Sequence, residues 1–131
     1  MDVMVELRPI GAMFSAGNFR AGLKELESLW SKVPDPKSET LNAYLIVEYG
    51  VALALKEADL EEAQAWADRA PMFAAKRHDM GEVEFLLGKV AFERGDFGKA
   101  KEQFIIANAK SEGRAFEAED ERYRRLIVDG S

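Results

Sequence analysis

Gly95-Asp96-Phe97-Gly98-Lys99-Ala100 is the stretch of sequence that says most about the fold, because it has counterparts at residues 17–22 and 58–63. Each begins with a small residue, followed by Asn or Asp and then a large apolar residue. Another small residue stands three positions further on. A small residue permits a tight turn at a helix end, and the oxygen of Asn or Asp caps the next helix. The apolar residue should enter the core, and the last small residue should let two helices approach closely.

The rest of the chain has the periodicity of helices. Apolar residues recur at helical spacing in every long segment, and no segment sustains strand alternation. Pro9 fits a first helical turn, Pro34 ends a helix, and Pro71 should end or bend one. Ser38 and Asp79 are the expected caps of the helices that follow them. The predicted helices are residues 9–16, 19–32, 39–57, 60–75, 79–94, 97–110 and 115–128.

The pattern around residues 81–114 resembles the tetratricopeptide repeat. In that copy, large and small residues follow the family's order at Leu87, Gly88, Phe92, Gly95, Asp96, Phe97, Ala100, Phe104 and Ala107. Two weaker copies keep Gly17-Asn18-Phe19 with Pro34, and Tyr49-Gly50 with Ala58-Asp59-Leu60. The family's usual Trp is absent, with Glu84 in its place in the best copy. The turns are 41 and 37 residues apart, against about 34 in the family.

The resemblance implies an all-α fold and a single domain over residues 1–131. Antiparallel helix pairs would stack as a short right-handed superhelix of about three repeats, at residues 9–36, 38–76 and 79–112. Residues 115–128 would form a C-terminal capping helix with a polar outer face. A nonrepeating helical bundle is the alternative, and it too is all-α.

Composition narrows the functional classes. The 131 residues carry a formal net charge of −6 and include no Cys and one His. Acidic character opposes nucleic-acid binding, and no apolar run is long enough to span a bilayer. We expect a cytoplasmic protein. Its acidity is explained either by solubility alone or by a basic protein partner that the acidic field attracts.

No catalytic or ligand-binding motif stands out. His78 is the only histidine, so zinc and most transition-metal sites are disfavoured. A serine–histidine–aspartate triad would depend on that same residue. Neither a phosphate loop nor a dinucleotide fingerprint is present. We therefore expect no enzyme, cofactor or metal. The phenylalanines of the best copy and Trp66 are read as core residues.

The predicted contact surface follows from the resemblance, because the first helix of each pair lines the concave face in that family. Aromatic anchors with a charged rim suit a protein interface. A second candidate surface is the acidic run at residues 117–121, although a solvated helix face is the simpler reading. The predicted partner-binding residues are Tyr44, Glu48, Glu82, Phe85, Lys89, Glu93, Glu117, Glu119 and Asp120. Tyr44 has core packing as its alternative.

These features predict a protein-binding module without catalytic activity. The favoured form is a dedicated inhibitor of one basic partner, such as a bacterial immunity protein that neutralises a secreted toxin domain. The stretch from Lys110 to Tyr123 resembles the tail of small bacterial tetratricopeptide-like proteins found beside such toxins. The alternative is an adaptor or chaperone that holds peptide segments of several clients. Self-association through an exposed apolar face is a further option.

Overall fold

A computed structural model describes residues 1–77 and 80–128. These residues are helical and contain no strand, which confirms the all-α prediction. The chain divides into two compact units, Met1–Arg69 and Ala70–Ser131. None of the described helices combines the length and apolar character needed to cross a membrane.

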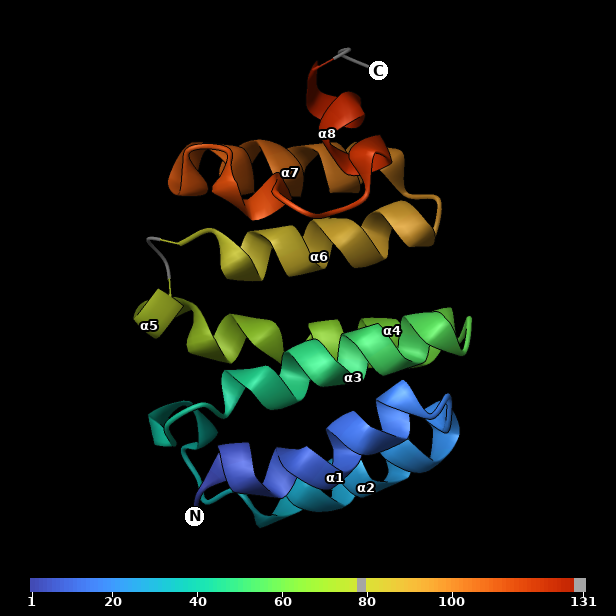
Figure 1. The fold of residues 1–131 in the computed structure, drawn as a ribbon. Coiled ribbons are helices and arrows are strands. Elements are labelled where there is room, and N and C mark those ends of the chain that lie inside the picture. The colour runs from blue at the N-terminus through green and yellow to red at the C-terminus, as the bar shows by residue number, and fades with distance from the viewer. Residues whose placement is uncertain (78–79, 129–131) are drawn as a thin grey trace. The chain divides into compact units, whose positions relative to one another are not determined.

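The first unit is built from two helix pairs. α1 (Val3–Ser15) packs on α2 (Phe19–Lys32), and α3 (Tyr44–Lys56) packs on α4 (Leu60–Ala67) (Figure 1). α3 also contacts both α1 and α2. A short 3-10 helix, Lys37–Glu39, lies between the pairs.

The second unit contains one long pair and a C-terminal segment. A 3-10 helix, Ala70–Phe73, leads into the short α5 (Ala74–Arg77). α6 (Glu82–Glu93) then packs on α7 (Phe97–Ser111). A 3-10 helix, Arg114–Phe116, and α8 (Glu121–Val128) follow, and both contact α7 (Figure 1).

The same turn closes all three long pairs, as the sequence predicted. Gly17, Ala58 and Gly95 each adopt a left-handed backbone, with φ of 80°, 56° and 84°. The N–H of Gly95 donates to the carbonyl of Phe92 at 3.0 Å, and the next N–H donates to the carbonyl of Ala91 at 2.9 Å. The other two turns repeat both bonds. These bonds satisfy carbonyl groups that the end of a helix leaves without partners.

The expected caps form in two of the three turns. The side chain of Asp59 accepts from the N–H of Glu62 at 3.1 Å, and that of Asp96 accepts from Lys99 at 3.2 Å. Asn18 makes no such side-chain bond, so its predicted role was wrong. The small residues that follow the caps are buried as expected: Gly22, Ala63 and Ala100.

Ala58 provides a test of the turn. An alanine in the left-handed region is strained by its Cβ, whereas glycine is not. We expect Ala58→Gly to raise the free energy of unfolding by about 1 kcal/mol. Ala65→Gly, at an exposed position inside α4, is the control and should lower it by about 0.5–1 kcal/mol. Urea unfolding followed by circular dichroism measures both, and a loss of stability in Ala58→Gly would contradict the argument.

Two helix starts differ from the prediction. α1 begins at Val3 and not at residue 9, because the side chain of Asp2 caps it by accepting from the N–H of Val5 at 3.3 Å. Pro9 therefore lies inside the helix. α3 begins at Tyr44 and not after Ser38, since Asn42 has a left-handed φ of 66° that interrupts the helix.

Other boundaries shift near Pro71 and Ala118. The helix predicted over residues 60–75 ends at Ala67, and Pro71 lies in the separate 3-10 helix. The last helix begins at Glu121 instead of residue 115, because Ala118 has a left-handed φ of 62°. α6 begins after Gly81, whereas the predicted cap Asp79, like His78, lies outside the described residues.

An aromatic pair lies in the core of the first unit. Trp66 is 1% exposed, which confirms its predicted packing, and its ring meets that of Trp30 edge to face at 6.2 Å between centroids. The guanidinium of Arg69 lies 4.0 Å from the centre of the Trp66 ring. It also forms an ion pair with Glu27 at 2.7 Å. The end of α4 is thus tied to α2.

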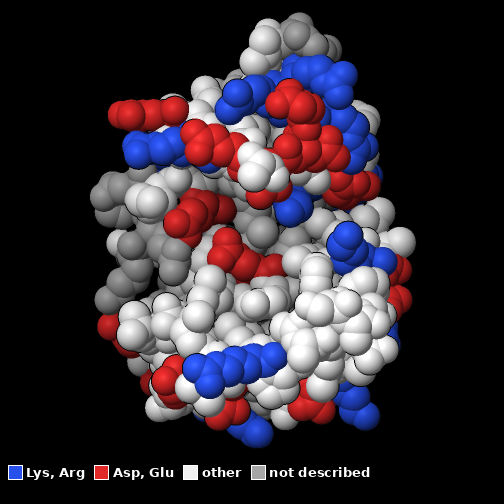
Figure 2. Space-filling model, in the orientation of Figure 1, with Lys and Arg blue, Asp and Glu red and all other residues white. Residues whose placement is uncertain are grey.

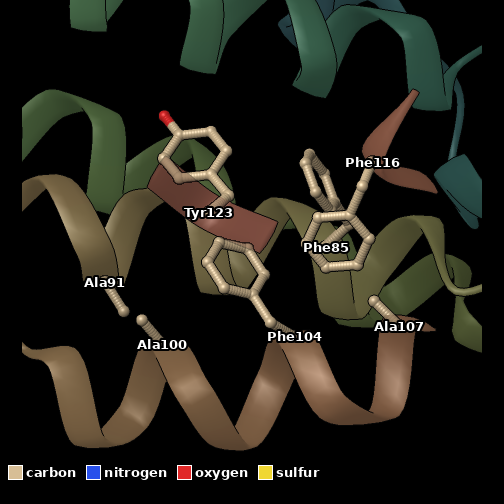
Figure 3. Packing of buried hydrophobic residues seen from close by; sticks show 7 residues of the cluster. All are labelled: Phe85, Ala91, Ala100, Phe104, Ala107, Phe116 and Tyr123. Atoms are coloured by element: carbon tan, nitrogen blue, oxygen red, sulfur yellow. The ribbon is translucent and has the colours of Figure 1, made fainter. Parts of the chain in front are cut away.

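Phe104 forms the centre of the core of the second unit. Its ring lies 5.4 Å from those of Phe85 and Phe116 and 5.3 Å from that of Tyr123, measured between centroids (Figure 3). Phe97, expected in the core, is instead 51% exposed and touches only the edge of this region. Phe97 is seven residues before Phe104 and so lies on the same side of α7, but it stands two turns earlier, at the first residue of the helix, where its ring meets that of Phe92 at 5.1 Å.

Candidate interaction site

Phe85 was predicted both as a core phenylalanine and as a partner contact, and the structure shows it as a core residue. Its side chain is 8% exposed, and its ring meets those of Phe116 at 5.1 Å and Tyr123 at 6.0 Å (Figure 3). Helical periodicity correctly predicted that Phe85 lies on the apolar face of α6. That face is covered by the chain's own C-terminal segment, so the side chain is withdrawn from solvent.

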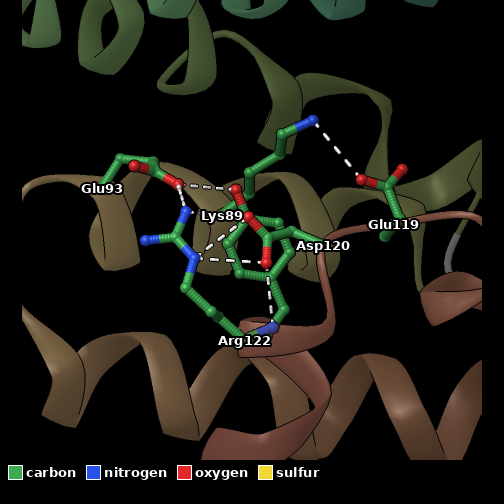
Figure 4. Close-up of polar contacts among 6 residues, drawn as sticks. Lys89, Glu93, Glu119, Asp120 and Arg122 are labelled. Carbon is green, nitrogen blue, oxygen red and sulfur yellow. Dashed lines mark hydrogen bonds and ion pairs between the residues drawn. The ribbon is translucent and has the colours of Figure 1, made fainter.

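The same segment engages Lys89 and Glu93, two of the three charged residues predicted on α6 (Figure 4). Lys89 lies 3.6 Å from the carboxylate of Glu119, and Arg122 lies 3.3 Å from that of Glu93. Arg122 also pairs with Asp120 at 2.8 Å. The structure therefore brings the two predicted surfaces of this unit together as partners of one another.

Hydrogen bonding and burial shift the pKa values of three groups in this network. The side chain of Arg122 donates to Asp120, and so does its backbone N–H, which lowers the pKa of that carboxyl. The same side-chain bond raises the pKa of Arg122. Burial raises the pKa of Tyr123, helped by the bond that its hydroxyl donates to Glu93 at 2.8 Å. These groups keep their ordinary charges near neutral pH and hold the C-terminal segment on α6.

The stretch from Lys110 to Tyr123, which resembles the tail of toxin-associated tetratricopeptide-like proteins, makes structural contacts within its own unit. The hydroxyl of Ser111 accepts from the N–H of Ala115 at 3.0 Å, where α7 ends. Phe116 and Tyr123 are buried, and Asp120 accepts from the N–H of Arg122 at the start of α8. Of the predicted acidic residues here, Glu117 is exposed to solvent.

Two predicted residues lie elsewhere. Tyr44 is 1% exposed, so it is core, as its alternative reading had it, and not contact surface. Glu82 lines a depression of about 320 Å³ together with Lys110 and Arg114. Lys110 forms an ion pair with Glu84 at 3.0 Å beside it. Opposite charges thus meet within this depression.

Glu48 lies in the wall of an open pocket of about 420 Å³ between α1 and α3. Apolar groups make up most of the lining, and the hydroxyls of Ser15 and Tyr49 with the Glu48 carboxylate supply the polar groups. Pockets of this size with mostly apolar walls and few polar groups are typical binding sites. The lining residues are Gly11, Phe14, Ser15, Leu45, Glu48, Tyr49 and Ala52.

The two units differ in charge. Residues 1–69 carry 12 acidic and 7 basic side chains, a net charge of −5, whereas residues 70–131 carry 12 and 11, a net charge of −1. Figure 2 shows basic and acidic side chains interspersed over α7 and α8, and a mostly uncharged lower surface around α1 that one basic side chain crosses. The pocket beside Glu48 therefore belongs to the unit that carries most of the negative charge.

Most of the pocket was not predicted from the sequence. Of its lining residues only Glu48 was a candidate, because the spacing within one helix does not show which residues of α1 and α3 meet. The one available signal was Gly11, since an isolated glycine inside a helix indicates a packing or functional reason. A Cβ at Gly11 would meet only the hydroxyl of Tyr49, at 3.7 Å. The glycine thus leaves space that a larger side chain would fill.

The described residues include no group of three or more His, Asp and Glu side chains arranged to hold a metal ion. Comparison of the chain with protein-family models, with curated proteins and with solved structures finds no match.

Proposed function

We propose that this chain is a protein-binding module without catalytic activity, built on tetratricopeptide-like helix pairs. The repeated turn at Gly17, Ala58 and Gly95, with its identical hydrogen bonds, supports the family proposal. A repeat of helix pairs needs such a turn between the two helices of each pair, and the family proposal rests on this local geometry.

The observation that carries the functional proposal is the pocket between α1 and α3. Its apolar wall suits a hydrophobic side chain of the partner. The net charge of −5 on this unit attracts a basic partner over longer distances. The partner is therefore a basic protein that inserts an apolar side chain.

The favoured form is a dedicated cytoplasmic inhibitor of one basic protein, such as an immunity protein against a bacterial toxin domain. On α6, the predicted contact residues Phe85, Lys89 and Glu93 are engaged by the chain's own C-terminal segment. This leaves the pocket of the first unit, which includes the predicted residue Glu48, as the candidate contact site, and a single pocket suits one defined partner.

Gly11→Leu tests the proposal by filling the pocket. We expect wild-type protein, tagged and used for affinity capture from its native cells, to retain one basic protein in stoichiometric amount. Gly11→Leu should lose it, because the new side chain enters the space beside Tyr49. Ala21→Leu is the matched control, at an exposed small residue of α2, and should retain the partner. Mass spectrometry of the eluates identifies the bound protein.

The other outcomes of the capture are equally informative. Equal retention by Gly11→Leu and the control would place the binding surface outside the pocket and sink the proposal. Several substoichiometric clients that share a short segment would make the protein an adaptor. Inhibition of a nuclease or other toxic activity in the captured complex would support the inhibitor.

A further inference from the structure

A stripe of apolar residues runs along the solvent side of α1, beside the exposed charged residues Glu6 and Arg8. Val5, Pro9 and Ala12, with Ala16 just after the helix, lie on one face by their spacing of four, three and four residues. All four are exposed, and Val5 is 43% exposed. These four residues are called the α1 stripe below.

The solvent face of α2, the other helix of this pair, is polar. The exposed residues of α2 after its first turn are Lys24, Glu25, Ser28, Ser31 and Lys32. A surface helix normally presents polar residues to water and apolar residues to the core. α2 follows this rule and α1 does not, so the α1 stripe is a local departure and not a property of the whole unit.

The α1 stripe meets the pocket on the same helix. Ser15, at the pocket rim, is one helical turn after Ala12, and residues three apart are neighbours on a helix. Pocket and stripe are therefore neighbours on α1, with the exposed Arg8 and Ser15 between them. Exposed acidic residues stand near its start, at Asp2 and Glu6, and Arg8 is the one basic residue of α1. An apolar centre with a charged rim is the arrangement of a protein interface.

We propose that the α1 stripe and the pocket together form one docking surface for an apolar patch bordered by Lys and Arg on another protein. This inference rests on the proposed function and extends its contact from one pocket to the outer face of α1. Charge argues against a second copy as the occupant, because two units of net charge −5 would face each other. A basic partner turns the same charge into attraction.

Ala12→Arg tests the α1 stripe, with Ser28→Arg on α2 as the control. Both positions are exposed on helices of the same unit and both variants add one positive charge. The probe is a fluorescein-labelled amphipathic helical peptide of leucine and lysine, compared with the same peptide carrying glutamate in place of lysine. Fluorescence anisotropy gives the affinities, and circular dichroism verifies that each variant is folded.

We expect the lysine peptide to bind wild-type protein at least about tenfold more tightly than the glutamate peptide. Ala12→Arg should weaken its binding about tenfold, and Ser28→Arg less than about twofold. Equal weakening by both variants would overturn the inference, because only net charge would then matter. Failure of the lysine peptide to bind would overturn it as well.

The oligomeric state tests the alternative that a second copy of the chain occupies the docking surface. Sedimentation should show a monomer for both wild type and Ala12→Arg. A wild-type dimer that Ala12→Arg dissociates would make a second copy the occupant and would overturn the inference. Gly11→Leu could abolish capture of the partner while Ala12→Arg leaves its binding unchanged. That result would keep the proposed function, with the pocket as the contact site, and would reject only the α1 stripe as part of the docking surface.

Discussion

Phe104→Ala is expected to lower the free energy of unfolding by about 3–5 kcal/mol, because it empties the centre of the core in the second unit. The side chain is fully buried, and three aromatic rings surround it at 5.3–5.4 Å. Two of those rings, of Phe116 and Tyr123, belong to the C-terminal segment. The loss should therefore loosen α8 along with the contact between α6 and α7.

The measurement can separate the two units. Both tryptophans, Trp30 and Trp66, lie in the first unit, so their fluorescence in urea reports on that unit alone. Circular dichroism reports on all helices. If the units unfold independently, Phe104→Ala will shift only part of the dichroism transition and leave the fluorescence transition in place. If they unfold together, both transitions will shift by the same amount.

Phe97→Ala is the control for Phe104. It removes the same side chain from the same helix, but Phe97 is 51% exposed and makes one aromatic contact, with Phe92 at 5.1 Å. We expect a cost of about 1 kcal/mol or less. Equal costs for the two variants would mean that the aromatic cluster around Phe104 does not stabilise the unit.

Local signals in the sequence predicted most of the helices. α2 has the predicted bounds, Phe19–Lys32, because a left-handed glycine precedes it and Pro34 follows it. Asp59 and Asp96 cap as expected, since capping depends on residues only three positions apart. The start of α1 was missed because Pro9 is typical of a first helical turn, whereas the helix is capped by Asp2, seven residues earlier.

The candidate site was less predictable, because burial depends on which distant segment covers a helix face. The helical pattern of α6 does not show that Phe116 and Tyr123 pack on Phe85. Likewise, no spacing within α3 shows that Glu48 shares a pocket with Gly11. Such sites arise from contacts between helices, and the order of residues along one helix does not determine them.

Gly50→Ala is expected to lower the free energy of unfolding by about 3 kcal/mol, although glycine to alanine inside a helix normally raises it by about 0.5–1 kcal/mol. A Cβ at Gly50 would lie 2.5 Å from Cγ of Trp66 and closer still to the adjoining ring carbon. These atoms lie near the backbone of α4, so the ring cannot swing away. α3 and α4 would have to separate.

Two other helical glycines, Gly88 and Gly11, show that the expected sign depends on the space around each Cβ. At Gly88 a Cβ would lie 2.6 Å from the Phe104 ring, and the same loss is expected there. At Gly11 the nearest atom would be 3.7 Å away, so Gly11→Ala should stabilise the protein by about 0.5–1 kcal/mol. Urea unfolding of the three variants compares these signs directly.

A double-mutant cycle identifies the cause of the Gly50 effect. In a Trp66→Leu background the bulky ring is absent, so Gly50→Ala should cost about 1–3 kcal/mol less than it does in the wild type. An unchanged cost would contradict a clash with Trp66 and would point to strain in α3 itself. A reduced cost would establish that Gly50 and Trp66 set the distance between α3 and α4. Because α3 also supplies one wall of the pocket, that distance helps to hold Glu48 and Tyr49 in place opposite α1.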